Sequence, residues 1–271
     1  MRRVAALVVR SGIRSLAALR AISPIVSGPR IITYHSIRAD DAGRQSAYVQ
    51  KSDFEVQLRW LIANGFEVVS MSKLLDALQM GGPMPDNWIC ITFDDGYSDT
   101  YSTAFPILQS HSMLATVFLI SGKVDREPGF LRTEQIREMH RYGFEFGAHT
   151  VDHLSLTSVP RHLARDQVFG SRSQLEDGLG ISVNHFCYPY GHFDAVVEEF
   201  VREAGYSTCC TEYAGPITSD TDPFHLLRIG VLGTDTTGDF SLRVRGAYDW
   251  WVNAYVGAGR WRGRRRKEMD T

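Results

Sequence analysis

The chain has 271 residues, of which 44% are hydrophobic and 22% are charged, close to the averages for globular domains. This composition excludes a disordered, a collagen-like or a disulfide-rich small protein, and the length predicts one large domain with tails. The formal net charge of -2 conceals basic ends, since residues 1–30 hold six arginines and no acid and residues 260–267 hold six basic residues. The four cysteines form no C-x-x-C pair, which favours a reduced, cytosolic setting.

The first segment, residues 1–29, is predicted to form a basic amphipathic helix, with arginines on one face and apolar side chains on another. Such a helix either lies on an anionic membrane surface or packs on the domain, because amphipathicity alone does not distinguish the two. The segment has no long apolar run and no small-residue cleavage site, so it predicts neither a signal peptide nor a membrane span. We therefore expect a cytoplasmic protein, with association to the inner face of the membrane as the open alternative.

From residue 30 onward, short apolar runs alternate with amphipathic runs, a pattern that predicts parallel strands joined by helices. Strands are expected at 31–34, 66–69, 88–93, 115–120, 144–148, 185–188, 206–210 and 226–231. A helix is expected to begin at the capping box Ser52-Asp53-Phe54-Glu55 and to end at Gly65, with further helices at 74–78, 134–141, 162–179 and 195–204. Seven or eight such strand and helix units in one domain predict an α/β barrel.

Polar groups follow four of the predicted strands directly. They are His35, the pair Asp94 and Asp95, His149, and the segment Tyr188-Pro189-Tyr190-Gly191. In a barrel of parallel strands the carboxyl ends of all strands lie on one face, where the loops carry the active groups. We therefore expect these residues to converge in one site.

The adjacent carboxylates Asp94 and Asp95 are typical of a metal site or of acid–base chemistry, because like charges repel unless a cation or a proton lies between them. Capping of a helix that begins near Ser98 or Asp99 is the alternative, since aspartate accepts backbone N–H bonds at helix starts.

The two histidines His149 and His153 are four residues apart, so on a helical turn both imidazoles point to one side, as metal coordination requires. Surface histidines without a ligand are the alternative. Together with Asp95 the pair supplies two neutral nitrogens and one carboxylate, the donor set of catalytic zinc sites that keep a position open for water and substrate.

The segments Thr92-Phe93-Asp94-Asp95-Gly96, His149-Thr150-Val151-Asp152-His153 and Tyr188-Pro189-Tyr190-Gly191 resemble, in this order, the motifs of the NodB-like polysaccharide deacetylase family, and the resemblance covers residues 31–231. It implies a single catalytic domain over residues 30–240, folded as a distorted (β/α)7–8 barrel. It further implies Asp94 as the general base, and Asp95, His149 and His153 as ligands of a divalent metal, zinc with cobalt or nickel as alternatives. The backbone N–H of Tyr190 would bind the oxyanion.

The chain departs from the family pattern at Cys187, where the resemblance predicts an arginine. Another group must then orient Asp94. Arg228 is the candidate, because a bidentate guanidinium fixes a carboxylate and keeps it ionised. An ordinary exposed strand arginine is the alternative.

A second departure is the missing C-terminal Leu-x-His element, which has no match after Gly233, whereas Ile32-Thr33-Tyr34-His35 stands near the start. This order is similar to the circularly permuted subgroup that deacetylates poly-N-acetylglucosamine. The resemblance implies His35 as the general acid toward the leaving amine, a role that suits the unperturbed pKa of imidazole. A structural histidine is the alternative.

Aromatic residues at the strand ends are candidate substrate contacts. Tyr34, Tyr188 and Pro189 are expected to bind the sugar, with Tyr190 and Trp88 in the same stacking platform. Packing of these rings in the core is the alternative.

These features predict a metal-dependent hydrolase that removes N-acetyl groups from an amino-sugar polysaccharide or its lipid-linked precursor. An O-deacetylase with the same metal site and a non-catalytic carbohydrate-binding relic of the fold are the alternatives. Residues 241–271 form an aromatic and Arg-rich tail, which suits a membrane interface or an anionic polymer. The expected partners are an N-acetylated glycan and, through the two tails, a membrane; no nucleic-acid-binding motif occurs.

Overall fold

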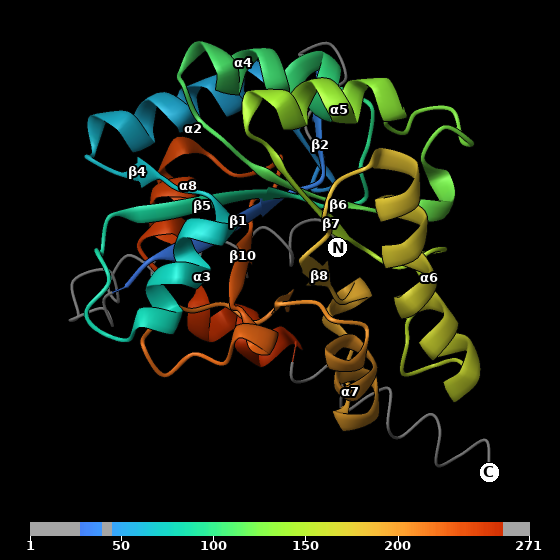
Figure 1. Ribbon diagram of the computed structural model, residues 1–271. Coiled ribbons are helices and arrows are strands. Elements are labelled where there is room, and N and C mark those ends of the chain that lie inside the picture. The colour runs from blue at the N-terminus through green and yellow to red at the C-terminus, as the bar shows by residue number, and fades with distance from the viewer. Residues whose placement is uncertain (1–27, 40–44, 257–271) are drawn as a thin grey trace, which may run out of the picture.

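The computed structural model describes residues 28–39 and 45–256 of the chain (Figure 1). The predicted helix of residues 1–29 therefore lies almost entirely outside the described residues, as does the predicted tail 241–271 from residue 257 onward. The described part of that tail is not a free extension, because Val244, Ala247 and Tyr248 are buried in the hydrophobic core. Within the described ranges, no helix combines the length and the apolar character that a membrane span requires.

Seven parallel strands form the centre of the molecule, in the order β10-β1-β5-β6-β7-β8-β9 (Figure 1). They are β1 (Arg30–Tyr34), β5 (Trp88–Phe93), β6 (Thr116–Leu119), β7 (Glu145–Ala148), β8 (His185–Cys187), β9 (Thr208–Cys210) and β10 (Arg228–Gly230), and the short β4 (Glu67–Val68) pairs with the start of β5. The two strands at the ends of this order, β10 and β9, approach each other, since the backbone N–H of Leu226, just before β10, donates to the carbonyl of Cys209 in β9 at 2.8 Å. The sheet is a nearly closed barrel, which confirms the predicted fold class.

Helices cover the outside of the barrel and connect its strands (Figure 1). They are α2 (Lys51–Ala63), α3 (Met71–Met80), α4 (Phe105–Ser110), α5 (Thr133–Tyr142), α6 (Arg161–Leu179), α7 (Ala195–Glu203) and α8 (Thr237–Val244). A π-helical turn (Thr100–Ala104) precedes α4, and 3-10 turns occur at Ser121–Lys123, Pro189–Gly191 and Pro223–His225. A small separate sheet pairs β2 (Ser36–Arg38) with β3 (Tyr48–Gln50).

The predicted strands and helices are present, with ends that differ by up to three residues. The predicted capping box is wrong, because the chain leaves β3 and enters α2 at once, so that Gln50 is the N-cap and Ser52 already lies in the first turn. The helix α8 and the strands β2 and β3 were not predicted, since each is at most eight residues long, too short for a clear hydrophobic period. The helix considered as an alternative near Ser98 or Asp99 is present, as the π-helical turn that leads into α4.

Side chains of β1 alternate between two surroundings, as strand geometry requires. Tyr34 points outward and packs against Phe54 of α2, with ring centroids 5.1 Å apart. Thr33 and, on the neighbouring strand, Thr92 face the barrel interior, where both contact Arg228. The larger hydrophobic core therefore lies between strands and helices, while the barrel interior holds a smaller apolar cluster that includes Ile31 and Phe118, with polar groups nearer the carboxyl-end face.

Close packing inside the barrel gives a test of the fold at Gly147 in β7. A Cβ at this position would lie 2.6 Å from the Phe118 ring and 2.7 Å from the carbonyl oxygen of His185. We expect Gly147→Ala to lower the free energy of unfolding in urea by about 1–3 kcal/mol, the usual cost of overpacking. Gly178→Ala in α6, where a Cβ meets open space, is the control and should raise it by about 0.5–1 kcal/mol. Equal changes in the two variants would contradict the packing described here.

Candidate active site

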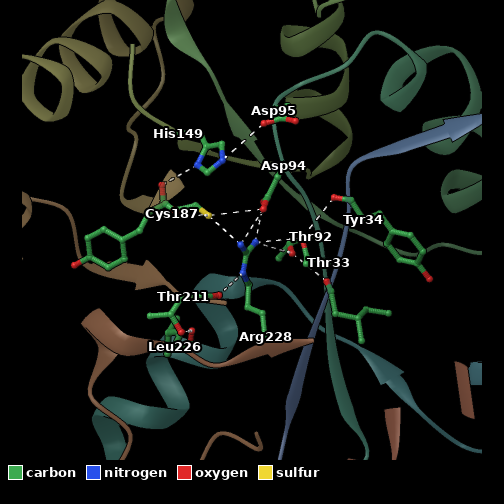
Figure 2. A network of polar contacts seen from close by, with 12 residues as sticks. Thr33, Tyr34, Thr92, Asp94, Asp95, His149, Cys187, Thr211, Leu226 and Arg228 are labelled. Atoms are coloured by element: carbon green, nitrogen blue, oxygen red, sulfur yellow. Dashed lines mark hydrogen bonds and ion pairs between the residues drawn. The ribbon is translucent and has the colours of Figure 1, made fainter. Parts of the chain in front are cut away.

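The predicted polar residues converge at the carboxyl ends of the strands. Asp94 and Asp95 follow β5, His149 follows β7, and Cys187 ends β8, and Figure 2 shows these side chains pointing toward one another. Arg228 begins β10 and is paired in register with Ile31, well below this face. Its long side chain runs up through the barrel interior to reach the site (Figure 2).

Arg228 holds Asp94 in a bidentate ion pair. The two terminal guanidinium nitrogens donate to the two carboxylate oxygens of Asp94 at 2.7 and 2.8 Å. Both side chains are almost fully buried. This geometry is the strongest form of an arginine–carboxylate contact, because it combines charge with two parallel hydrogen bonds.

The remaining donors of Arg228 are also used. Its Nε donates to the carbonyl of Thr211 at 3.2 Å, and Nη1 lies within 3.4 Å of the hydroxyls of Thr33 and Thr92. Nη2 contacts the sulfur of Cys187 at 3.0 Å. The guanidinium therefore occupies the space beside Cys187, the position at which the resemblance predicts an arginine. A long side chain at residue 187 would displace it.

The ion pair determines the charge state of Asp94. Burial raises the pKa of this carboxyl, but the Arg228 guanidinium, with a smaller contribution from the nearby histidines, holds it well below its usual range. Burial raises the pKa of the Cys187 thiol well above its usual value, so the thiol is neutral. Asp94 is consequently an ionised carboxylate in a buried, polar setting, as a general base must be.

Asp95, His149 and His153 form a compact donor set next to this pair. Each offers one ligand atom, and the three atoms lie within 4.8 Å of one another. Oδ1 of Asp95 is 3.5 Å from Nε2 of His153 and 3.8 Å from Nε2 of His149, and the two imidazole nitrogens are 3.1 Å apart.

Three observations test whether this set fits a divalent metal. Oδ1 of Asp95 is buried and accepts no hydrogen bond from any residue in the described part of the chain. Nδ1 of His149 lies 2.8 Å from the carbonyl of Cys187, so it carries the proton and leaves the lone pair of Nε2 directed at Asp95. Burial lowers the pKa of His149 to about 4, which keeps its imidazole neutral. The donor set of Asp95, His149 and His153 therefore fits a divalent metal.

Backbone strain is concentrated at the site. Four of the six described non-glycine residues with positive φ lie here: Asp95 (72°), Thr150 (66°), His153 (58°) and Tyr190 (59°). Non-glycine residues in this region cost of order 1–3 kcal/mol each and cluster where a function demands a fixed side-chain direction. At residues 150 and 153 the strain turns the loop so that His153 faces back toward His149.

His35 stands at the edge of the site. It is exposed, it is the single residue between β1 and β2, and its charge acts on Asp94 and His153. Glu212, which sequence reasoning missed, belongs to the same edge, because the charges of Arg228, Asp94, His35 and His153 all act on its carboxyl. Burial raises the pKa of Glu212 while Arg228 lowers it, and the net direction is upward. Its place two residues after the end of β9 was the available signal.

The predicted aromatic platform is wrong for most of its members. The ring of Tyr34 is fully buried, and its hydroxyl donates to Gln57 at 2.9 Å. Tyr188 is buried against Phe193, and Pro189 is buried as well. None of the three is exposed to a sugar. Trp88 lies at the start of β5, at the opposite end of the barrel from the site.

Tyr190 is the aromatic residue that reaches solvent beside the donor set. Half of its side chain is exposed, and its ring centroid is 4.7 Å from that of His153. Tyr190 lies in the turn Pro189–Gly191, where a Cβ on Gly191 would lie 2.8 Å from Glu212. The turn therefore packs directly against the segment that follows β9.

The fold and the site define a class: a (β/α) barrel with a buried, arginine-bound carboxylate beside a candidate metal site, an arrangement suited to hydrolysis. Residues 81–209 match the family model of polysaccharide deacetylases. Over this range the chain is similar to the polysaccharide deacetylases, a family that is generally metal-dependent.

Individual relatives agree with this family. The chain is 29% identical over 201 residues to the putative polysaccharide deacetylase YxkH of Bacillus subtilis, a match that covers 74% of this chain and 70% of YxkH. It is 23% identical over 226 residues to the poly-beta-1,6-N-acetyl-D-glucosamine N-deacetylase of Escherichia coli K12, covering 68% of this chain but only about a third (34%) of that protein. The structure of IcaB from Ammonifex degensii superposes with a TM-score of 0.70 at 26% identity, over 82% of this chain and 98% of that one.

Proposed function

We propose that the protein hydrolyses N-acetyl groups of a poly-N-acetylglucosamine-type glycan or its lipid-linked precursor. The observation that carries the proposal is the ionised carboxylate of Asp94, held by Arg228 beside the donor set of Asp95, His149 and His153. The substrate class is supported by the names of the relatives, since the Escherichia coli protein is a poly-beta-1,6-N-acetyl-D-glucosamine N-deacetylase.

We infer that Asp95, His149 and His153 hold the metal, with zinc as the first candidate and cobalt or nickel as alternatives. Two imidazoles and one carboxylate suit all three ions, so availability decides among them. When bound, a divalent ion lowers the pKa of a water molecule and polarises the acetyl carbonyl.

The residues around the metal site carry the proton transfers. Asp94 accepts the proton of the attacking water while the oxygen of that water bonds to the acetyl carbon. The backbone N–H of Tyr190 stabilises the negative charge that develops on the carbonyl oxygen. His35 donates a proton to the nitrogen as the C–N bond breaks, and the products are acetate and a free amine.

The function is tested by acetate release from N-acetylglucosamine oligomers and from O-acetylated xylo-oligomers. Protein stripped with a chelator is compared with and without added zinc or cobalt. We expect metal-dependent release from the N-acetylated oligomers. Release of acetate from the O-acetylated substrate alone would show that the protein is an O-deacetylase, which cleaves esters. Glycan binding without release from either substrate would support the non-catalytic carbohydrate-binding relic.

The role of Arg228 as the residue that orients the base predicts a kinetic signature. Arg228→Lys keeps the positive charge but cannot make the two parallel bonds to Asp94. We expect kcat for acetate release to fall by about 10–100-fold, because small misplacements of a catalytic group cost this much, while KM changes little. A wild-type kcat, or a rise in KM alone, would contradict the role.

The basic ends remain the predicted membrane contact, at the inner face of the membrane. Sedimentation with anionic vesicles is expected to be stronger for the full chain than for a chain lacking residues 1–29. Neutral vesicles are the control, because the attraction depends on the surface charge of the lipid. Equal sedimentation of both chains would instead favour a helix that packs on the domain.

A further inference from the structure

The corner that carries His35 is held by one side chain from the segment after β5, the strand next to β1 in the barrel. His35 is the only residue between β1 and β2, so its direction depends on how β2 is held. Ser36, the next residue, is buried, and its hydroxyl donates to Oδ2 of Asp99.

Asp99 makes several contacts with this corner. Burial raises the pKa of the Asp99 carboxyl, while the Ser36 hydroxyl, the backbone of Ile37 in β2 and the guanidinium of Arg38 lower it. Arg38 in turn donates to the Ser36 hydroxyl at 3.3 Å and lies over the ring of Tyr48 in β3. The first residues of β2 therefore interact with Asp99, and the Ser36 hydroxyl bonds to it directly.

The backbone of Asp99 belongs to the segment that carries the base and the first metal ligand. It lies four residues after Asp95 and immediately before the π-helical turn Thr100–Ala104. A π turn contains an extra residue per turn, and such turns are frequent at functional sites. The bond between residues 36 and 99 therefore joins two walls of the site that are 63 residues apart in sequence.

We propose that Asp99 is a positioning residue for His35: through Ser36 it holds the imidazole over the site, in place to protonate the leaving amine. The inference rests on the proposed function, in which His35 is the general acid. His35 itself is exposed, and an exposed imidazole on a short corner takes its position from the backbone that carries it. That backbone is the corner between β1 and β2, which Asp99 holds.

A dependence on the leaving group separates this role from a merely structural one. An amine leaves an acetamide only when its nitrogen is protonated, so misplacing the acid slows amide hydrolysis. The phenolate of 4-nitrophenyl acetate leaves without a proton, so its hydrolysis still needs Asp94 and the metal site but not His35. Loss of folding or of the metal would slow both reactions alike.

The experiment compares N-acetylglucosamine oligomers with 4-nitrophenyl acetate for the zinc-loaded wild type and three variants, Ser36→Ala, Asp99→Asn and His35→Ala. Ser36→Ala and Asp99→Asn should lower kcat on the oligomers by about 10–100-fold, the effect of a misplaced catalytic group. Hydrolysis of the aryl ester should stay within about 2-fold of wild type. In the His35→Ala background, adding Asp99→Asn should not lower kcat on the oligomers further, because both substitutions remove the same contribution, that of the general acid.

The pair Ser173 and Asp177 in α6 is the matched control, since it makes the same kind of bond, at 3.1 Å, on an exposed helix. Ser173→Ala and Asp177→Asn should leave both reactions unchanged. Equal losses on oligomer and ester in Ser36→Ala and Asp99→Asn, or unchanged kcat on the oligomer, would overturn the proposal. If His35→Ala has the wild-type kcat on the oligomers, the general acid is another residue, and the role proposed for Asp99 is refuted as well. A wild type inactive on oligomers but active on the ester would refute the proposed amide substrate instead.

Discussion

Replacing Asp94 with asparagine should remove most acetate release and leave the metal bound. The amide cannot accept the proton of the attacking water, and a general base contributes about 10²–10⁴-fold to the rate. Asp95, His149 and His153 are unchanged, so metal content after dialysis should equal that of the wild type. Acetate release and metal analysis on the same preparation measure both effects, and a variant with more than about a tenth of the wild-type rate would exclude Asp94 as the base.

The same substitution should also destabilise the protein, which requires its own control. The neutral amide of Asp94→Asn would leave the buried guanidinium of Arg228 without a counter-charge, and breaking a buried pair from one side costs about 3–5 kcal/mol. The double variant Asp94→Asn with Arg228→Leu removes both charges and should recover much of the free energy of unfolding while remaining inactive. Recovery of stability without activity separates the chemistry of Asp94 from its structural contribution.

The second large effect is expected for His149→Ala. The substitution removes one of three predicted ligands, so we expect the affinity for zinc to fall by more than about 100-fold, since even loss of a supporting contact to a ligand costs about 10–100-fold. Acetate release should be lost at stoichiometric zinc. Competition with a chelating dye measures the affinity directly, independent of turnover.

The control for this variant is His162→Ala, which removes an exposed histidine at the start of α6. Its zinc affinity and rate should match the wild type. An unchanged zinc affinity in His149→Ala would mean that the ion binds elsewhere, and the donor set proposed here would be incorrect.

The barrel was predictable because its strands are buried on both faces and therefore read as continuous apolar runs, as in β5. Elements that lack this signal were missed or misplaced. The small sheet of β2 and β3 has three residues in each strand, and the start of α2 is set by the preceding strand rather than by a capping side chain. The ends of these elements are therefore set by their contacts in the folded chain and not by the local sequence.

The convergence of Asp94, Asp95, His149 and His153 was also predictable, since each follows or ends near a strand of one parallel barrel. The aromatic contacts were predicted wrongly, although strand alternation could have excluded Tyr34. Consecutive residues of a strand point to opposite faces, so Tyr34 and His35 could not both face the same site. Tyr34 points to the helices, and its burial follows from that alternation.

The contact between Arg228 and Asp94 spans 134 residues, and Arg228 was predicted as the partner because Cys187 stands where the resemblance predicts an arginine. Glu212 and Asp99 were missed. Both are ordinary acidic residues in sequence, and only the folded chain places them beside His35 and Ser36.

The order of the strands has a consequence for the assembly of the protein during synthesis. β1 is made first but lies between β5 and β10, and β10 is the last strand of the barrel to be made. Until β10 docks, Asp94 has no guanidinium beside it, and a carboxylate without a partner resists burial. The closed barrel and the counter-charge of the buried base therefore both depend on the same last strand, β10.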